Sequence, residues 1–106
     1  MFVQVFTGWR YRPGARERLV AMGLGRAASP APRPAVPGLV ARLLATATDD
    51  ADTGIGVWVW EDEAACRAYE AARSPEATAA IERDVDESAL REETFDALFL
   101  GCRVTG

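Results

Sequence analysis

The sequence predicts an α+β domain, with a four-stranded antiparallel sheet that carries its helices on one face. Four segments have the alternating, β-branched and aromatic composition of strands. Three segments between them have apolar residues at helical spacing, and proline, aspartate or serine stands where each helix should begin. The chain has 106 residues, which suffices for one core, so we expect a single domain over residues 1–106.

The first two elements are a strand and a helix. Residues 2–9 carry apolar side chains on both faces, which predicts a central strand that is covered on both sides. Pro13 and Gly14 follow, and a proline in the first turn of a helix removes only an N–H that would be unpaired anyway. We expect this helix over about residues 15–22, with inward-facing side chains at Ala15, Leu19 and Met22.

Residues 26–38 are rich in proline and contain four of the six prolines of the chain. This composition predicts an extended surface loop. The loop either covers a sheet edge or the mouth of a pocket, or it is a solvated insertion without a role.

A β-hairpin is predicted next. Residues 39–48 alternate between two faces and form the second strand. Residues 49–54 are a polar turn, so the second strand should pair antiparallel with a third strand that begins at Ile55. In the third strand, alternation places Trp58 and Trp60 on the same face.

The third strand leads directly into a helix. Asp62 stands at the N-cap position, and Glu61 and Glu63 place negative charge at the positive end of the helix dipole. Four residues then recur at helical spacing and form one face, namely Ala65, Cys66, Tyr69 and Ala72. We therefore expect Tyr69 to lie across from the two tryptophans.

A third helix and a last strand complete the predicted domain. Ser74 is a plausible N-cap and Pro75 the first helical residue, so the helix should run from there to about Leu90. We expect residues 94–104 to form the last strand, again with two apolar faces.

The predicted order of elements is β-α-β-β-α-α-β, which favours a ferredoxin-like split βαβ sandwich. Helices can cover only one face of such a sheet. The other face also carries apolar residues, either Ile55, Val57 and Val59 or the residues that alternate with them. A free apolar face of that size favours burial against a second, two-fold related copy of the chain.

Composition excludes several kinds of function. The net charge is −4, which disfavours nucleic acid or an anionic membrane surface as a partner. All 12 basic residues are arginine, and the chain lacks lysine, histidine and asparagine. A lysine Schiff base, a histidine base and a Ser-His-Asp triad are therefore excluded.

The two cysteines, Cys66 and Cys102, lack the paired spacing of a metal site, so we expect no metal and two buried thiols. No run of residues approaches the ~18 apolar residues of a membrane span, and the N-terminus lacks the basic region of a signal peptide. A cytoplasmic protein is expected.

Three motifs resemble the antibiotic biosynthesis monooxygenase family, which belongs to the dimeric α+β barrel superfamily. Pro13-Gly14 follows the first strand, residues 37–39 (PGL) open the second, and residues 60–65 (WEDEAA) precede Tyr69. The resemblance spans nearly the whole chain. Cys66 stands where the family has an aromatic residue, and Tyr69 stands where it usually has a histidine.

The resemblance implies a homodimer whose two sheets build a barrel, with a small-molecule pocket between each sheet and its own helices. Members of the family oxidise aromatic polyketide intermediates with dioxygen and without a bound metal or flavin, because the deprotonated substrate supplies the electrons. Relatives degrade haem with an asparagine, a tryptophan and a histidine. The absence of asparagine and histidine here disfavours the haem reaction.

Three residues are candidates for catalysis. Trp60 matches the family tryptophan and would pack against the reacting ring, or it fills the core at a strand end. The phenol of Tyr69 could donate a hydrogen bond to an oxyanion that develops in the substrate, or it is a core tyrosine. Arg42 could hold a phenolate or carboxylate if it faces the pocket, or pair with a carboxylate at the dimer seam.

Trp58, Tyr11 and Cys66 are candidates for substrate binding. Trp58 points the same way as Trp60, Tyr11 lies at the expected rim, and Cys66 is either a small buried residue or a reactive thiol. Asp96 is a carboxylate in the last strand that could act as a base, be an exposed edge residue or pair with an arginine. The alternatives to an oxygenase are a non-catalytic dimeric protein that binds a hydrophobic metabolite, and a structural dimer whose tryptophans fill its own pocket.

Overall fold

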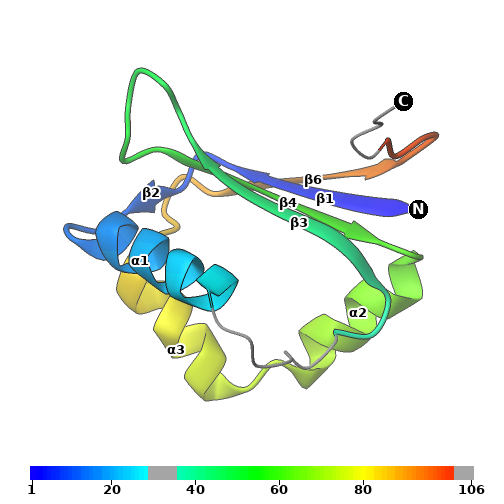
Figure 1. Ribbon diagram of the computed structural model, residues 1–106. Helices are drawn as coiled ribbons and strands as arrows, with labels where there is room; N and C mark the ends of the chain where they lie inside the picture. Colours follow the sequence, from blue (N-terminus) through cyan, green and yellow to red (C-terminus); the bar gives the residue numbers. More distant parts are fainter. Residues whose placement is uncertain (29–35, 102–106) are drawn as a thin grey trace.

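The computed structural model describes residues 1–28 and 36–101 of the chain. It contains a four-stranded antiparallel sheet in the order β3-β4-β1-β6 and a short two-stranded ribbon of β2 and β5. Three helices lie on one face of the larger sheet (Figure 1). The elements are β1 (Phe2–Thr7), β2 (Arg10–Tyr11), α1 (Ala15–Ala28), β3 (Leu39–Thr46), β4 (Gly54–Trp60), α2 (Glu63–Ala72), α3 (Pro75–Asp84), β5 (Val85–Asp86) and β6 (Arg91–Asp96).

The predicted fold class and hairpin are confirmed. β1 is central, with β4 on one side and β6 on the other, and β3 pairs antiparallel with β4. Directly opposite residues of antiparallel strands point to the same face of a sheet. Gln4 is opposite both Trp58 and Thr94, so these three side chains face the helices.

No helix of the described residues lies on the other face of the sheet (Figure 1). We call it the outer face. Leu43 and Phe95 on this face are 56% and 50% exposed. The expectation that the first strand is covered on both sides is therefore met on only one face by the described residues. Nine apolar residues belong to the outer face by register: Val3, Val5, Ala41, Leu43, Ala45, Ile55, Val57, Val59 and Phe95.

The first strand ends earlier than predicted, and the ribbon of β2 and β5 was not foreseen. The chain turns at Gly8, which has a φ of 78°, and a side chain at this position would clash with the carbonyl of Ala89. After the turn, Tyr11 pairs with Val85 and Arg10 with Asp86. The pairing explains why α3 ends at Asp84 rather than near Leu90, because Val85 already belongs to a strand.

Two further boundaries differ from the prediction. α1 continues to Ala28 rather than stopping near residue 22, and it includes Gly23 and Gly25. A glycine inside a helix costs only about 1 kcal/mol relative to alanine, which neighbouring helix formers can offset. The helix thus includes the first residues of the predicted loop, and residues 29–35 of that loop lie outside the described part of the chain.

The last strand covers Arg91–Asp96 rather than residues 94–104, and residues 102–104 are not among those described. β6 is an edge strand that pairs only with β1, and polar side chains are common on such edges. The strand therefore begins in a polar segment that periodicity did not mark.

The caps of α2 and α3 are as predicted. The side chain of Asp62 accepts a hydrogen bond from the backbone N–H of Ala65 at 2.8 Å, and Ser74 accepts one from Ala77 at 3.1 Å. Pro75 occupies the first turn of α3. Within the described residues, none of the helices combines the length and the apolar character that crossing a bilayer requires.

The core is divided into two clusters on the helix-facing side of the sheet. One is built on Phe2, Trp60 and Cys66 and lies between β4 and α2. The other is built on Trp9, Tyr11 and Ala15, beside α1. Figure 1 shows the corresponding separation, with α2 under one end of the sheet and α1 and α3 under the other.

Candidate functional site

Two tryptophans of β4 and a tyrosine of α2 meet as the sequence predicts. The rings of Trp58 and Trp60 are stacked, with centroids 5.7 Å apart and planes inclined by 8°. Tyr69 lies across from both, with its ring centroid 5.5 Å from that of Trp58 and 5.4 Å from that of Trp60. Strand alternation and the Asp62 cap together produce this arrangement, because the cap sets where α2 begins and hence where Tyr69 points.

Arg42 joins this aromatic group from β3. It pairs with Trp58 in the register of the sheet, and its guanidinium carbon lies 4.3 Å from the centroid of the Trp58 ring. A guanidinium at this distance from an indole face makes a cation–π interaction. Arg42 therefore lies on the helix-facing side rather than on the outer face, where a dimer seam would be.

The aromatic residues differ in how much surface they offer to a ligand. Trp60 and Cys66 have no exposed surface, whereas Trp58 and Tyr69 are partly buried and Arg42 is exposed. The indole N–H of Trp60 donates a hydrogen bond to Oε1 of Gln4 at 2.9 Å. Trp60 and Cys66 thus lie beneath the residues of this group that solvent reaches, which are Trp58, Tyr69 and Arg42.

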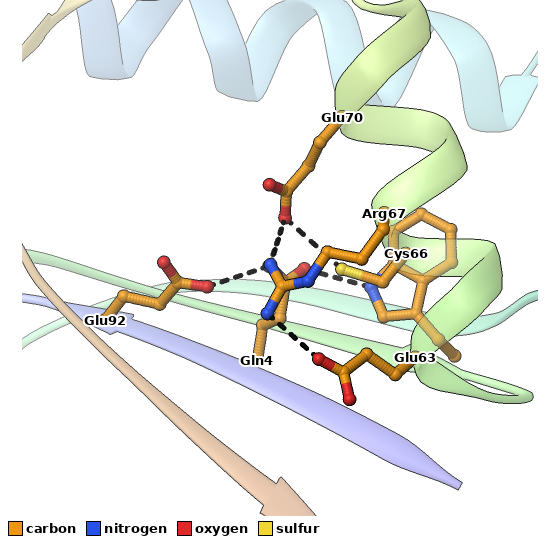
Figure 2. Close-up of polar contacts among 7 residues, drawn as sticks. Gln4, Glu63, Cys66, Arg67, Glu70 and Glu92 are labelled. Atoms are coloured by element: carbon orange, nitrogen blue, oxygen red, sulfur yellow. Dashed lines mark hydrogen bonds and ion pairs between the residues drawn. The ribbon is translucent and has the colours of Figure 1, made fainter.

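A polar network beside Trp60 was not identified from the sequence. Gln4 is 3% exposed, and its amide nitrogen donates to Oε1 of Glu70 and to Oε1 of Glu92, each at 2.9 Å (Figure 2). The guanidinium of Arg67 binds the same oxygen of Glu70 at 3.2 Å. The signal that could have found it is the single glutamine of the chain, which stands between apolar residues of a strand.

Cys66 belongs to this network. Its thiol donates a hydrogen bond to Glu70 at 3.3 Å. Burial, followed by the hydrogen bond and charge of Glu70, raises the pKa of the Cys66 thiol to about 11. Nucleophilic cysteines need a lowered pKa, so this environment supports a structural role and not a reactive thiol.

Tyr11 lies apart from the aromatic group. Its ring packs edge-on against Trp9 with centroids 4.8 Å apart, in the cluster beside α1. Tyr11 is 8% exposed, and burial raises the pKa of its phenol. It lines a hollow of about 330 Å³ between α1 and β3, together with Arg16, Leu19, Val20, Leu44, Ala45 and Thr46.

A second hollow, of about 410 Å³, brings two of the family-like motifs together. Pro37 and Gly38 approach α2, and Gly38 has a φ of 76° at a point where a Cβ atom would clash with that of Ala65. Tyr69 lines this hollow as well as contacting the tryptophans. Tyr69 therefore belongs both to the aromatic group and to the lining of an open hollow.

Asp96 and a metal site remain to be considered. Asp96 is exposed at the end of β6, in line with the edge interpretation. Across residues 1–28 and 36–101, histidine, cysteine and carboxylate side chains do not form a group of three that could hold a metal ion.

Comparison with known proteins supports the fold. No protein-family model and no curated protein matches the sequence. Among solved structures, a protein of Deinococcus radiodurans described as an antibiotic biosynthesis monooxygenase matches over 100% of both chains, with a TM-score of 0.61 and 14% identity. SnoaB, a cofactor-independent oxygenase from Streptomyces nogalater, matches over 93% of this chain and 92% of its own, with a TM-score of 0.57 and 22% identity.

A third structure is MhuD with two manganese protoporphyrin IX molecules bound per active site, which matches over 100% of both chains with a TM-score of 0.57 and 18% identity. At these identities the matches speak to architecture. They confirm the predicted resemblance at the level of the fold, since the chain has the α+β fold of antibiotic biosynthesis monooxygenase structures.

Proposed function

We propose that the protein is a cofactor-independent monooxygenase that acts on an aromatic or polyketide-type small molecule with dioxygen. The observation that carries the proposal is the convergence of Trp58, Tyr69 and Arg42 on the helix-facing side of the sheet. Two aromatic rings offer a stacking surface, and a cation and a phenol next to them suit a substrate that becomes an anion. The fold shared with SnoaB, described as a cofactor-independent oxygenase, supports the same reaction class.

Each accessible residue has a distinct role in this proposal. Trp58 packs against the substrate ring. Arg42, which lies 4.3 Å from that indole, stabilises the enolate or phenolate and so lowers the pKa of the substrate. Tyr69 donates a hydrogen bond to the same developing oxyanion. Solvent takes the proton, and the deprotonated carbon transfers electrons to dioxygen and forms a hydroperoxide. The hydroperoxide then loses water, so that a CH2 group becomes a carbonyl with one oxygen atom from dioxygen, and the other oxygen leaves as water with two hydrogens.

The test is dioxygen uptake with an anthrone-type substrate. We expect Arg42→Gln and Tyr69→Phe each to lower kcat/KM at least 10-fold, because each removes a contact to the oxyanion. Arg73→Gln is the matched control, since Arg73 is exposed at the end of α2 and its loss changes the net charge equally. Uptake that is unchanged in both site variants would refute the assigned roles.

A non-catalytic binding protein is the second candidate. The observation that favours it is the packing of the site, in which Arg42 covers part of Trp58 and Trp60 is wholly buried. Saturable quenching of tryptophan fluorescence by anthrones, without dioxygen uptake, would identify this case. No response of either kind would leave only the structural-dimer alternative.

We also propose that the protein is a homodimer and is cytoplasmic, as the sequence predicts. The support for a dimer is the apolar outer face, which no helix of the described chain covers (Figure 1). Two such faces packed together would form the barrel that the resemblance implies.

A further inference from the structure

The hollow between α1 and β3 has the features of a small binding site of its own. Its volume is about 330 Å³, within the range of small-molecule pockets. The side chains of Leu19, Val20 and Leu44 line it, and the charged group among the lining residues is the guanidinium of Arg16. None of the lining residues belongs to the aromatic group of Trp58, Trp60 and Tyr69.

Among the described residues, Arg16 lacks a carboxylate partner of the kind that Arg10 and Arg18 have. Within residues 1–28 and 36–101, the buried Nε of Arg16 has no hydrogen-bond partner, and no carboxylate forms a salt bridge with Arg16. By contrast, Arg10 pairs with Asp50 at 2.9 Å and Arg18 with Asp84 at 2.7 Å. A buried donor without an acceptor is rare in folded proteins and calls for a physical explanation.

The position of Arg16 in its helix points the same way. It is the second residue of α1, where the helix dipole is positive and a cation is disfavoured. Tyr11 lies close enough for the charge of Arg16 to counteract the effect of burial on the pKa of its phenol. An anion bound here would pair with the guanidinium of Arg16 at the positive end of the helix, next to the phenol of Tyr11 and the aliphatic side chains of the hollow.

We propose that this hollow binds the carboxylate of a small apolar acid. The guanidinium of Arg16 turns to present two N–H groups to the two carboxylate oxygens, and the Tyr11 hydroxyl donates a further hydrogen bond. The apolar part of the acid lies against Leu19, Val20 and Leu44. This site is separate from the proposed oxygenase site and does not depend on it.

The probe is 2-naphthoate, with the neutral 2-naphthalenemethanol as its uncharged counterpart. Titrations are followed by methyl NMR, because Leu19, Val20 and Leu44 place reporter groups in the wall of the hollow. We expect saturable shifts of these three signals with naphthoate and at least 10-fold weaker binding of the alcohol. Equal binding of acid and alcohol would overturn the proposal, as would shifts confined to the residues around Tyr69.

The variants assign the charge to Arg16. Arg16→Gln should weaken naphthoate binding at least 10-fold and leave the binding of the alcohol unchanged, and Arg73→Gln should bind naphthoate as the unmodified protein does. If Arg16→Gln does not fold, Arg16→Lys retains the charge without the two-pronged geometry and should bind a few-fold more weakly. Naphthoate affinity that is the same in every folded Arg16 variant would refute the assignment.

Discussion

One amide connects four elements of the protein. Gln4 of β1 accepts from Trp60 of β4 and donates to Glu70 of α2 and to Glu92 of β6. Both of its N–H groups and its oxygen are used, so the orientation of the side chain is fixed by its partners. Since a buried polar group is stabilising only when its partners are complete, the identity of residue 4 should matter more than its exposure alone suggests.

Gln4→Glu tests this network with a change of almost no volume. The introduced carboxylate would face Glu70 and Glu92, which lose their donor and gain a like charge. Its folded-state pKa should therefore lie above its unfolded value of about 4.3, so the charge-dependent part of the loss is small below pH 4 and grows as pH rises from the unfolded to the folded pKa. We expect a cost of about 1–3 kcal/mol in the free energy of unfolding at pH 7, measured by urea denaturation.

Gln4→Met is the matched control. It removes the hydrogen bonds without adding a charge, so its cost should vary little between pH 4 and pH 7. A Gln4→Glu loss that is the same at both pH values would show that the carboxylates are too well solvated to interact.

At the scale of elements, strongly patterned segments could be predicted and weakly patterned ones could not. Alternation in β4 and the cap at Asp62 were enough to place Trp58, Trp60 and Tyr69 together. β2 and β5 have two residues each, too few to show any period, and they form only because the turn at Gly8 brings them together. Gln4 could not be recognised as a site residue from the sequence, because Glu70 and Glu92, to which it donates hydrogen bonds, are 66 and 88 residues away.

The N-cap of α2 should stabilise both the helix and the aromatic group. Asp62→Ala removes the acceptor for the Ala65 N–H and should cost about 1 kcal/mol, which lowers Tm by roughly 4–8 °C in a domain of this size. Because α2 carries Tyr69 against the tryptophans, the near-UV circular dichroism of these rings should weaken as the first turn loosens.

Ser74→Ala provides the comparison, since it removes the equivalent cap of α3. It should cost a similar free energy but leave the near-UV signal of the Trp58–Tyr69 group unchanged, because α3 lies under the other end of the sheet (Figure 1). An equal spectral change in both variants would contradict the assignment of that signal to α2.

At the scale of the whole molecule, the sheet separates two environments. Its helix-facing side carries Trp58 and Arg42, which meet Tyr69 of α2, and its outer face is mostly apolar and has no helical cover among the described residues. The sequence indicated two apolar faces but not which one the helices would take. That choice depends on pairing between distant strands, such as Gln4 with Trp58, which local periodicity does not specify.

Adjacent leucines of β3 allow a direct test of which face forms the dimer. Leu43 points to the outer face and is 56% exposed, whereas Leu44 points to the helix-facing side and is 45% exposed. Both side chains are exposed to solvent in the single chain, so an arginine at either position should still allow the chain to fold. A stable dimer must bury roughly 1,200–2,000 Å² in total, and a charge in the centre of that area is strongly disfavoured.

At micromolar concentration, light scattering should give twice the 11.4 kDa of one chain for the unmodified protein and for Leu44→Arg, and the mass of one chain for Leu43→Arg. An unmodified protein that is monomeric would refute the dimer, and a dimer that survives Leu43→Arg but not Leu44→Arg would assign the interface to the opposite face.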